Sequence, residues 1–209
     1  AAKGCTHLKT PSVHRQGRSA RRERIQVMLK LSDNPPCRYP QAGSLREYQG
    51  TWWVGHTRSR FEKAFAWRLL KSGIPYYLPM VEKTRLSGGR KRTVLSPLFS
   101  SYVFFCGDAA QRYEAMTTNC LCQTLPVEDR DTLVEQILAI ETALASKTPL
   151  DPYGRKAVGR RCRVRAGALA GYEGVVVREQ GRARIVLEVS ILGQGAALEI
   201  ETDLLDPID

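Results

Sequence analysis

Ser96-Pro-Leu-Phe-Ser-Ser-Tyr-Val-Phe-Phe105 is the stretch that decides the fold of this chain. After Pro97 it holds four aromatic residues in eight positions, a composition typical of a buried strand. Pro97 has no backbone N–H and cannot donate a hydrogen bond to a neighbouring strand, so we place it at the start of the strand. A central strand needs a neighbour on each side, and segments 49–57 and 74–85 supply two further strands with a helical segment between them. This order of elements predicts an α+β domain.

Three more segments complete this first domain. Apolar residues recur at helical spacing in 60–72 and 128–146, and residues 108–116 favour a helix between them. Residues 117–125 favour a short strand. We expect an antiparallel sheet with two helices on one face, in a domain that spans residues 49–146.

The pattern changes after residue 146. Residues 147–157 hold two prolines and a glycine without apolar periodicity, which predicts a flexible linker. Residues 158–209 form short, alternating apolar segments separated by glycine-rich turns. This spacing is typical of a small β-barrel, so we expect a second, all-β domain.

The positive charge is concentrated at the N-terminus. The net charge is +11, and the first 50 residues hold ten Lys and Arg against three Asp and Glu. We expect residues 1–48 to be a basic, largely disordered extension with one short helix at 18–30. Such an arm suits contact with nucleic acid through counterion release, although a solvated tail explains the same charge.

Cysteine and histidine usage argues against metal and catalytic sites. The six cysteines form no C-x-x-C pair, so we expect reduced thiols, a reducing compartment such as the cytoplasm, and no metal or cofactor. The three histidines do not combine with a carboxylate and a nucleophile, so we expect no enzyme. No apolar run reaches about 20 residues, which argues against a transmembrane helix. The Arg-rich start leaves a transit peptide open.

A turn at 87–89 predicts a hairpin that gathers basic side chains. The residues concerned are Lys83, Arg85, Arg90, Lys91 and Arg92. Two interpretations stand side by side: a solvated hairpin that protects a sheet edge, or a basic finger beside nucleic acid.

Two sets of motifs resemble a known pair of domains. Trp52-Trp-Val-Gly-His-Thr57 with Glu62-Lys63, Leu78-Pro-Met-Val-Glu82 and Ser96-Pro-Leu-Phe-x-x-Tyr-Val-Phe resemble the N-terminal (NGN) domain of NusG-type transcription factors. Residues 159–176 are similar to the KOW motif, with glycines at Gly167, Gly171 and Gly174. The resemblance implies an NGN domain at 49–146 and an SH3-like KOW barrel at 158–209. The basic extension favours a specialised paralog, as in the RfaH, UpxY and LoaP group.

The resemblance implies a factor that binds elongating RNA polymerase and modulates pausing, termination or antitermination. In the family, an apolar patch docks on the clamp helices of the largest polymerase subunit. The corresponding residues here are Tyr77, Leu98, Phe99, Tyr102 and Phe104. The stretch has more aromatic rings than one sheet face buries, so we expect about half to be exposed as interface anchors. Thr117 and Thr118 lie where relatives place a gate loop that touches the opposing jaw.

The resemblance also implies partners for the other surfaces. The hairpin at Ile191, Leu192 and Gly193 corresponds to the one that binds a small-subunit ribosomal protein or Rho, and Leu192 stands where an aromatic residue is common. That departure leaves the choice between the two partners open. The basic finger would face upstream or non-template DNA. We expect a monomer.

The alternative function is that of a KOW-type RNA-binding, ribosome-associated protein. In this interpretation the arginine run at 160–165 contacts ribosomal RNA. Residues 147–209 carry a net charge of only +1, from ten basic and nine acidic side chains. An rRNA-binding domain is expected to be basic throughout, so the composition counts against this alternative.

Overall fold

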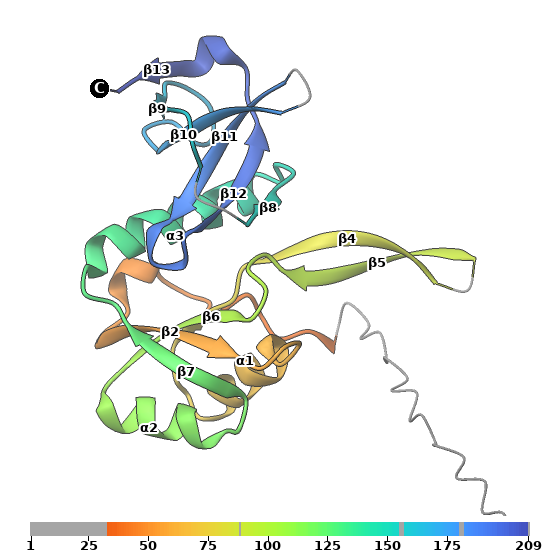
Figure 1. Cartoon of the computed structure of the whole chain (residues 1–209). Helices are drawn as coiled ribbons and strands as arrows, with labels where there is room; N and C mark the ends of the chain where they lie inside the picture. The colour runs from red at the N-terminus through yellow and green to blue at the C-terminus, as the bar shows by residue number, and fades with distance from the viewer. Residues whose placement is uncertain (1–32, 88, 155–156, 180–181, 209) are drawn as a thin grey trace, which may run out of the picture.

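The computed structural model describes residues 33–87, 89–154, 157–179 and 182–208 (Figure 1). The N-terminal domain is built on a five-stranded antiparallel sheet in the order β1-β3-β6-β2-β7. Its strands are β1 (Arg38–Tyr39), β2 (Thr51–Thr57), β3 (Tyr76–Tyr77), β6 (Tyr102–Gly107) and β7 (Leu121–Pro126). β6 is the central strand, with β3 and β2 as its neighbours. The α+β architecture predicted from the sequence is confirmed.

The stretch 96–105 forms two strands and not one. Strand β5 (Arg90–Pro97) ends at the proline, a turn follows, and β6 starts at Tyr102. In the turn, Ser101 adopts a left-handed φ of 67° and its amide N–H donates to Oε1 of Glu62 at 2.6 Å. The prediction of one continuous strand is therefore wrong here, because Pro97 and the two serines favour a turn.

Helices cover both faces of this sheet. They are α1 (Glu62–Lys71), α2 (Ala109–Thr117) and α3 (Arg130–Ala145). Val103 and Phe105 of β6 join a core cluster with residues of α1 and α2, whereas Phe104 joins a second cluster with residues of α3. α2 and α3 accordingly lie on opposite sides of the sheet in Figure 1. We expected two helices on one face, and the third helix closes the other.

Residues 33–48 are ordered, in contrast to the disordered extension expected for 1–48. β1 pairs with β3, and Leu45 in the 3-10 helix η2 (Leu45–Glu47) is completely buried. Nζ of Lys63 donates to Oδ1 of Asn34 at 2.6 Å and to the carbonyl of Leu95 at 2.5 Å. This burial stabilises a segment that its own sequence does not mark as structured. The rest of the extension, with the helix predicted at 18–30, lies outside the described residues.

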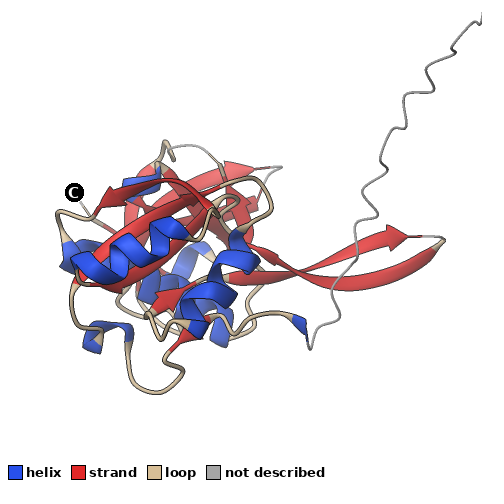
Figure 2. Cartoon of the chain, turned by 90° about the horizontal axis from the view of Figure 1, so that it is seen from below, coloured by secondary structure: helices blue, strands red, loops and turns tan. Residues whose placement is uncertain are grey.

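The predicted hairpin projects away from both domains. β4 (Met80–Ser87) pairs with β5 along its whole length as a separate two-stranded sheet. Figures 1 and 2 show this ribbon reaching into solvent from the edge of the N-terminal domain.

The C-terminal domain contains an antiparallel sheet of six strands in the order β13-β9-β10-β11-β12-β8. These strands are β8 (Asp151–Tyr153), β9 (Arg160–Val164), β10 (Glu173–Glu179), β11 (Arg182–Val189), β12 (Gln194–Glu199) and β13 (Leu205–Pro207). Short 3-10 helices η3 (Ser190–Leu192) and η4 (Thr202–Leu204) complete it. The all-β prediction is confirmed.

The segment 147–157 contains a strand of this sheet. β8 pairs with β12, the side chains of Leu150 and Tyr153 are buried, and Arg184 binds Asp151 at 2.6 Å. The prediction of a linker without structure is wrong here, because Leu150 between the prolines and Tyr153 after them are buried in the fold.

Candidate interaction surfaces

Four of the five residues expected to dock on a partner lie in the core. Their exposed fractions are 1 % for Tyr77, Leu98 and Phe99 and 0 % for Phe104. Phe104 packs edge-to-face on Phe99, with ring centroids 6.2 Å apart, and stacks on Tyr77 at 6.3 Å. The same cluster includes Ile137 of α3. The expectation that half of these rings are exposed is wrong for this arrangement, because α3 covers their face of the sheet.

Tyr102 is the exception. Its ring is half-buried and stacks on His56 of β2, with centroids 5.1 Å apart. The two residues are cross-strand partners, and His56 in turn pairs with the exposed Gln123 of β7. The row of Tyr102, His56 and Gln123 is therefore the accessible end of the sheet face that α3 covers. Sequence reasoning found no catalytic role for His56, and only the register brings it beside Tyr102.

The hydroxyl of Tyr77 is buried under this cover and finds no hydrogen-bond partner among the described residues. Burial raises the pKa of Tyr77 well above its ordinary value. A buried polar group without a partner costs about 1–3 kcal/mol, so the packing of α3 on this face of the sheet includes one unfavourable group, the Tyr77 hydroxyl.

Thr117 and Thr118 end helix α2 and do not form a free loop. Thr117 Oγ1 donates to the carbonyl of Glu114 and Thr118 Oγ1 to that of Ala115, each at 2.7 Å. Thr117 is exposed and Thr118 half-buried. The helix end therefore presents one accessible threonine to solvent.

The hairpin brings the predicted basic positions together. Register places Lys83 opposite Val94, Arg85 opposite Arg92, and Lys91 opposite Leu86. Arg90, Lys91 and Arg92 are exposed, and Lys83 is half-buried.

The glycines of the KOW-like motif are each required by the backbone. Gly167 and Gly171 both have a φ of 88°, in the left-handed region that favours glycine. A Cβ on Gly174 would lie 2.7 Å from the side chain of Ile185 and from the carbonyl of Val186. The first two glycines shape the turn before β10, and the third allows β10 and β11 to approach closely.

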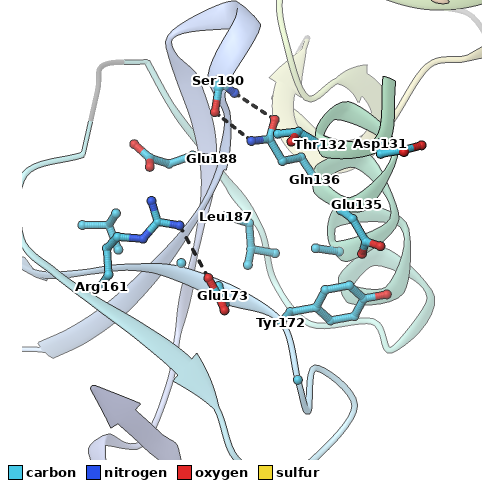
Figure 3. A pocket seen from close by; sticks show the side chains of 14 residues that line it. Asp131, Thr132, Glu135, Gln136, Arg161, Tyr172, Glu173, Leu187, Glu188 and Ser190 are labelled. Atoms are coloured by element: carbon cyan, nitrogen blue, oxygen red, sulfur yellow. Dashed lines mark hydrogen bonds and ion pairs between the residues drawn. The ribbon is translucent and has the colours of Figure 1, made fainter. Parts of the chain in front are cut away.

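The two domains contact each other through α3, which sequence reasoning missed. The amide N–H of Ser190 donates to Oε1 of Gln136 at 3.0 Å, and Nε2 of Gln136 donates back to Oγ of Ser190 at 2.7 Å (Figure 3). Thr142 and Tyr172 share a further hydrogen bond of 3.2 Å. Ile185, Leu187 and Val189 of β11 belong to the same apolar cluster as α3. The apolar and small residues all around α3 were the available signal, because such a helix is buried on several sides.

This contact engages the hairpin at Ile191, Leu192 and Gly193. Ile191 and Leu192 are both half-buried and pack against the shared cluster, and Gly193 ends η3 with a left-handed φ of 59°. Ile191 also lines a groove of about 260 Å³ with Val127 and Leu133.

A crevice of about 560 Å³ lies between the first part of α3 and the C-terminal domain. Figure 3 shows acidic side chains from both domains around it. They are Asp131, Glu135, Glu173 and Glu188. Arg161 lies 3.5 Å from Glu173, and the hydrogen bond from Arg163 lowers the pKa of Glu173.

The described residues hold no group of three or more His, Cys, Asp or Glu that could bind a metal ion. Within the same ranges, no helix has the length and apolar character needed to cross a membrane. Three of the five described cysteines are buried, and burial raises the pKa of Cys106 to about 11.

Comparisons with known proteins give one family match and several similar solved structures. The solved structures similar to this chain include that of Thermotoga maritima NusG, on its domain interaction, and the MjSpt4:Spt5 complex in conformation B, each at 16% sequence identity. The first match covers 77% of this chain and 98% of the other with a TM-score of 0.43, and the second covers 76% and 97% with a TM-score of 0.23. A search of curated proteins found no match. Residues 50–129, which make up most of the N-terminal domain, match the family model described as transcription termination factor nusG.

Proposed function

We propose that this chain is a transcription elongation factor that binds RNA polymerase through its N-terminal domain. The observation that carries the proposal is the NusG family match over residues 50–129, whose description names a transcription factor and not an enzyme. The site of action is the cytoplasm, and the basic N-terminal residues favour a specialised paralog.

First contact with the clamp helices is assigned to the row of Tyr102, His56 and Gln123. Tyr102 is accessible there, and an aromatic side chain at a partly buried site is a typical interface anchor. Leu98, Phe99, Tyr77 and Phe104 join the contact when α3 shifts, and the unpaired Tyr77 hydroxyl lowers the cost of that shift. Thr117 and Thr118 at the end of α2 would meet the opposing jaw.

A pull-down of purified core RNA polymerase tests this proposal. Tyr102→Ala is expected to weaken binding at least tenfold, on the scale of an interface anchor. Tyr113→Ala is the matched control, because Tyr113 is 72 % exposed on α2, on the other face of the sheet. Circular dichroism verifies that both variants fold. Binding that is equal for the wild type and Tyr102→Ala would reject this docking site, and a wild type that does not bind would reject the function.

The C-terminal domain is proposed to recruit a small-subunit ribosomal protein or Rho through Ile191, Leu192 and Gly193. We call the arrangement in which the two domains contact each other through α3 the closed arrangement. In it this hairpin packs against α3, so recruitment of the partner requires the domains to separate into an open arrangement. The hydrogen bonds between Gln136 and Ser190 stabilise the contact between the domains and therefore compete with binding of the partner to this hairpin.

The contacts of the arginine run count against the alternative of an rRNA-binding protein. Arg161 and Arg163 pair with Glu173, and Arg165 donates to the carbonyl of Asp203 at 2.6 Å. Cations that are already paired offer less attraction to phosphates. The basic positions of the β4–β5 hairpin are the better nucleic-acid contact, and upstream or non-template DNA is its proposed partner.

A further inference from the structure

The register of the β4–β5 hairpin divides its side chains into two rows of different charge. Residues directly opposite each other lie on one face of a ribbon, and successive residues alternate between faces. One face therefore carries the basic row, which comprises Lys83, Arg90, Arg92 and Val94. The other carries the neutral row, which comprises Glu82, Thr84, Leu86, Lys91, Thr93 and Leu95.

The two rows differ in what they attract. The described residues of the basic row include three cations and no acid, whereas the single cation of the neutral row, Lys91, is offset in net charge by Glu82. Leu86 in the neutral row is 76 % exposed, and Leu95 packs at the base of the ribbon against the cluster below α1 and α2. A phosphate backbone is attracted to one face of the ribbon and not to the other.

The chemistry of the ribbon suits a double helix. Residues 80–97 contain no aromatic side chain on which an unpaired base could stack, and stacking is the usual basis of single-strand binding. A two-stranded ribbon fits the major groove of B-form DNA, which is about 12 Å wide. The deep, narrow major groove of A-form RNA does not admit such an element.

We propose that the β4–β5 hairpin binds duplex DNA with one face, through phosphate contacts from Lys83, Arg90 and Arg92, while Lys91 points away from the DNA. The inference rests on the nucleic-acid contact proposed for this hairpin and refines it: the adjacent exposed cations Lys91 and Arg92 differ in function because they lie on opposite faces.

Fluorescence anisotropy with the full chain, a labelled DNA duplex and no polymerase tests the proposal. A plot of log affinity against log salt concentration has a negative slope, and each lost phosphate contact reduces the magnitude of that slope by about 0.9. Arg92→Gln is expected to lower the slope by about that amount and Arg90→Gln/Arg92→Gln by about twice as much. Lys91→Gln, the matched control with the same charge change, is expected to leave the slope unchanged.

Three further results complete the test. A duplex RNA and a single-stranded DNA of equal length are expected to respond less to Arg92→Gln than duplex DNA does. Equal losses for Lys91→Gln and Arg92→Gln would overturn the one-sided arrangement but keep the hairpin as a nucleic-acid contact. If neither variant changes the slope, or if the wild type does not bind duplex DNA at low salt, the proposed contact between the hairpin and nucleic acid is rejected as well. The polymerase pull-down is independent of each of these outcomes.

Discussion

At the scale of single residues, the start of α3 depends on the Asp129 carboxylate. It accepts hydrogen bonds from the hydroxyl of Thr132 at 2.6 Å and from its amide N–H at 3.0 Å, and these bonds lower the pKa of Asp129 below its ordinary value of 3.8. The stability that the ionised group contributes is present above that value and is lost as the pH falls through the lowered pKa.

Asp129→Asn retains a capping oxygen but cannot titrate. We therefore expect the difference in Tm between wild type and variant to shrink as the pH falls from about 5 to about 2. Thermal unfolding followed by circular dichroism measures it, with Glu128→Gln as the control for a neighbouring charge. A difference that is constant with pH would contradict this role of the cap.

Residue-scale features were predictable where they depend on local sequence. The basic positions of the hairpin follow from a turn between two strands. The start of α3 was predicted at residue 128, two residues before its observed start, and the cap formed by Asp129 was missed. The burial of Phe99 and Phe104 was not predictable, because it depends on a helix that starts at Arg130. The pairing of His56 with Tyr102 joins strands 46 positions apart, and only the register reveals it.

At the scale of elements, β8 makes the segment between the domains part of the C-terminal fold. Tyr153 is 8 % exposed and belongs to a core cluster with Val175 and Val186. Tyr153→Ala should lower the free energy of unfolding of this domain by about 3–5 kcal/mol, the usual cost of truncating a buried aromatic side chain. Urea unfolding measures the change. Val158→Ala, at a residue that is 87 % exposed, should change it by less than about 0.5 kcal/mol, and an equal effect of the two variants would show that β8 is not structural.

Elements with strong periodicity were predicted close to their observed bounds, as α1 and α3 illustrate. Residues 33–48 and 147–157 were not, because their prolines and glycines resemble those of flexible segments. The described residues of both segments are held by tertiary contacts: β1 completes the first sheet beside β3, and β8 the second beside β12. Pairing with a distant strand leaves no local pattern in so short a segment.

At the scale of the whole molecule, Gln136 connects the two domains. Gln136→Ala removes the acceptor of the Ser190 amide N–H and the donor to its hydroxyl. Two hydrogen bonds of about 1 kcal/mol each correspond to a roughly tenfold or larger shift toward the open arrangement. Hydrogen exchange of the Ser190 amide should accelerate by about that factor.

Gln123→Ala, at an exposed residue of β7, is the control for this measurement. A combined Gln136→Ala/Tyr172→Phe variant also loses the bond to Thr142 and should let the domains tumble separately in nuclear spin relaxation. Unchanged exchange at Ser190 together with joint tumbling would show that the apolar contact alone holds the domains.

The position of α3 between two domains has a consequence for synthesis on the ribosome. The helix packs on the first sheet as soon as residues 33–145 have emerged, but its other side has no cover until the following strands are made. On that side Ala139 lines the domain crevice, and Ala143 lies one turn further along. Apart from Leu133, which lines the groove with Ile191, small side chains leave little apolar area in water during this interval, which limits adhesion between growing chains. We therefore expect the nascent N-terminal domain to resist aggregation during the time before the C-terminal domain is synthesised.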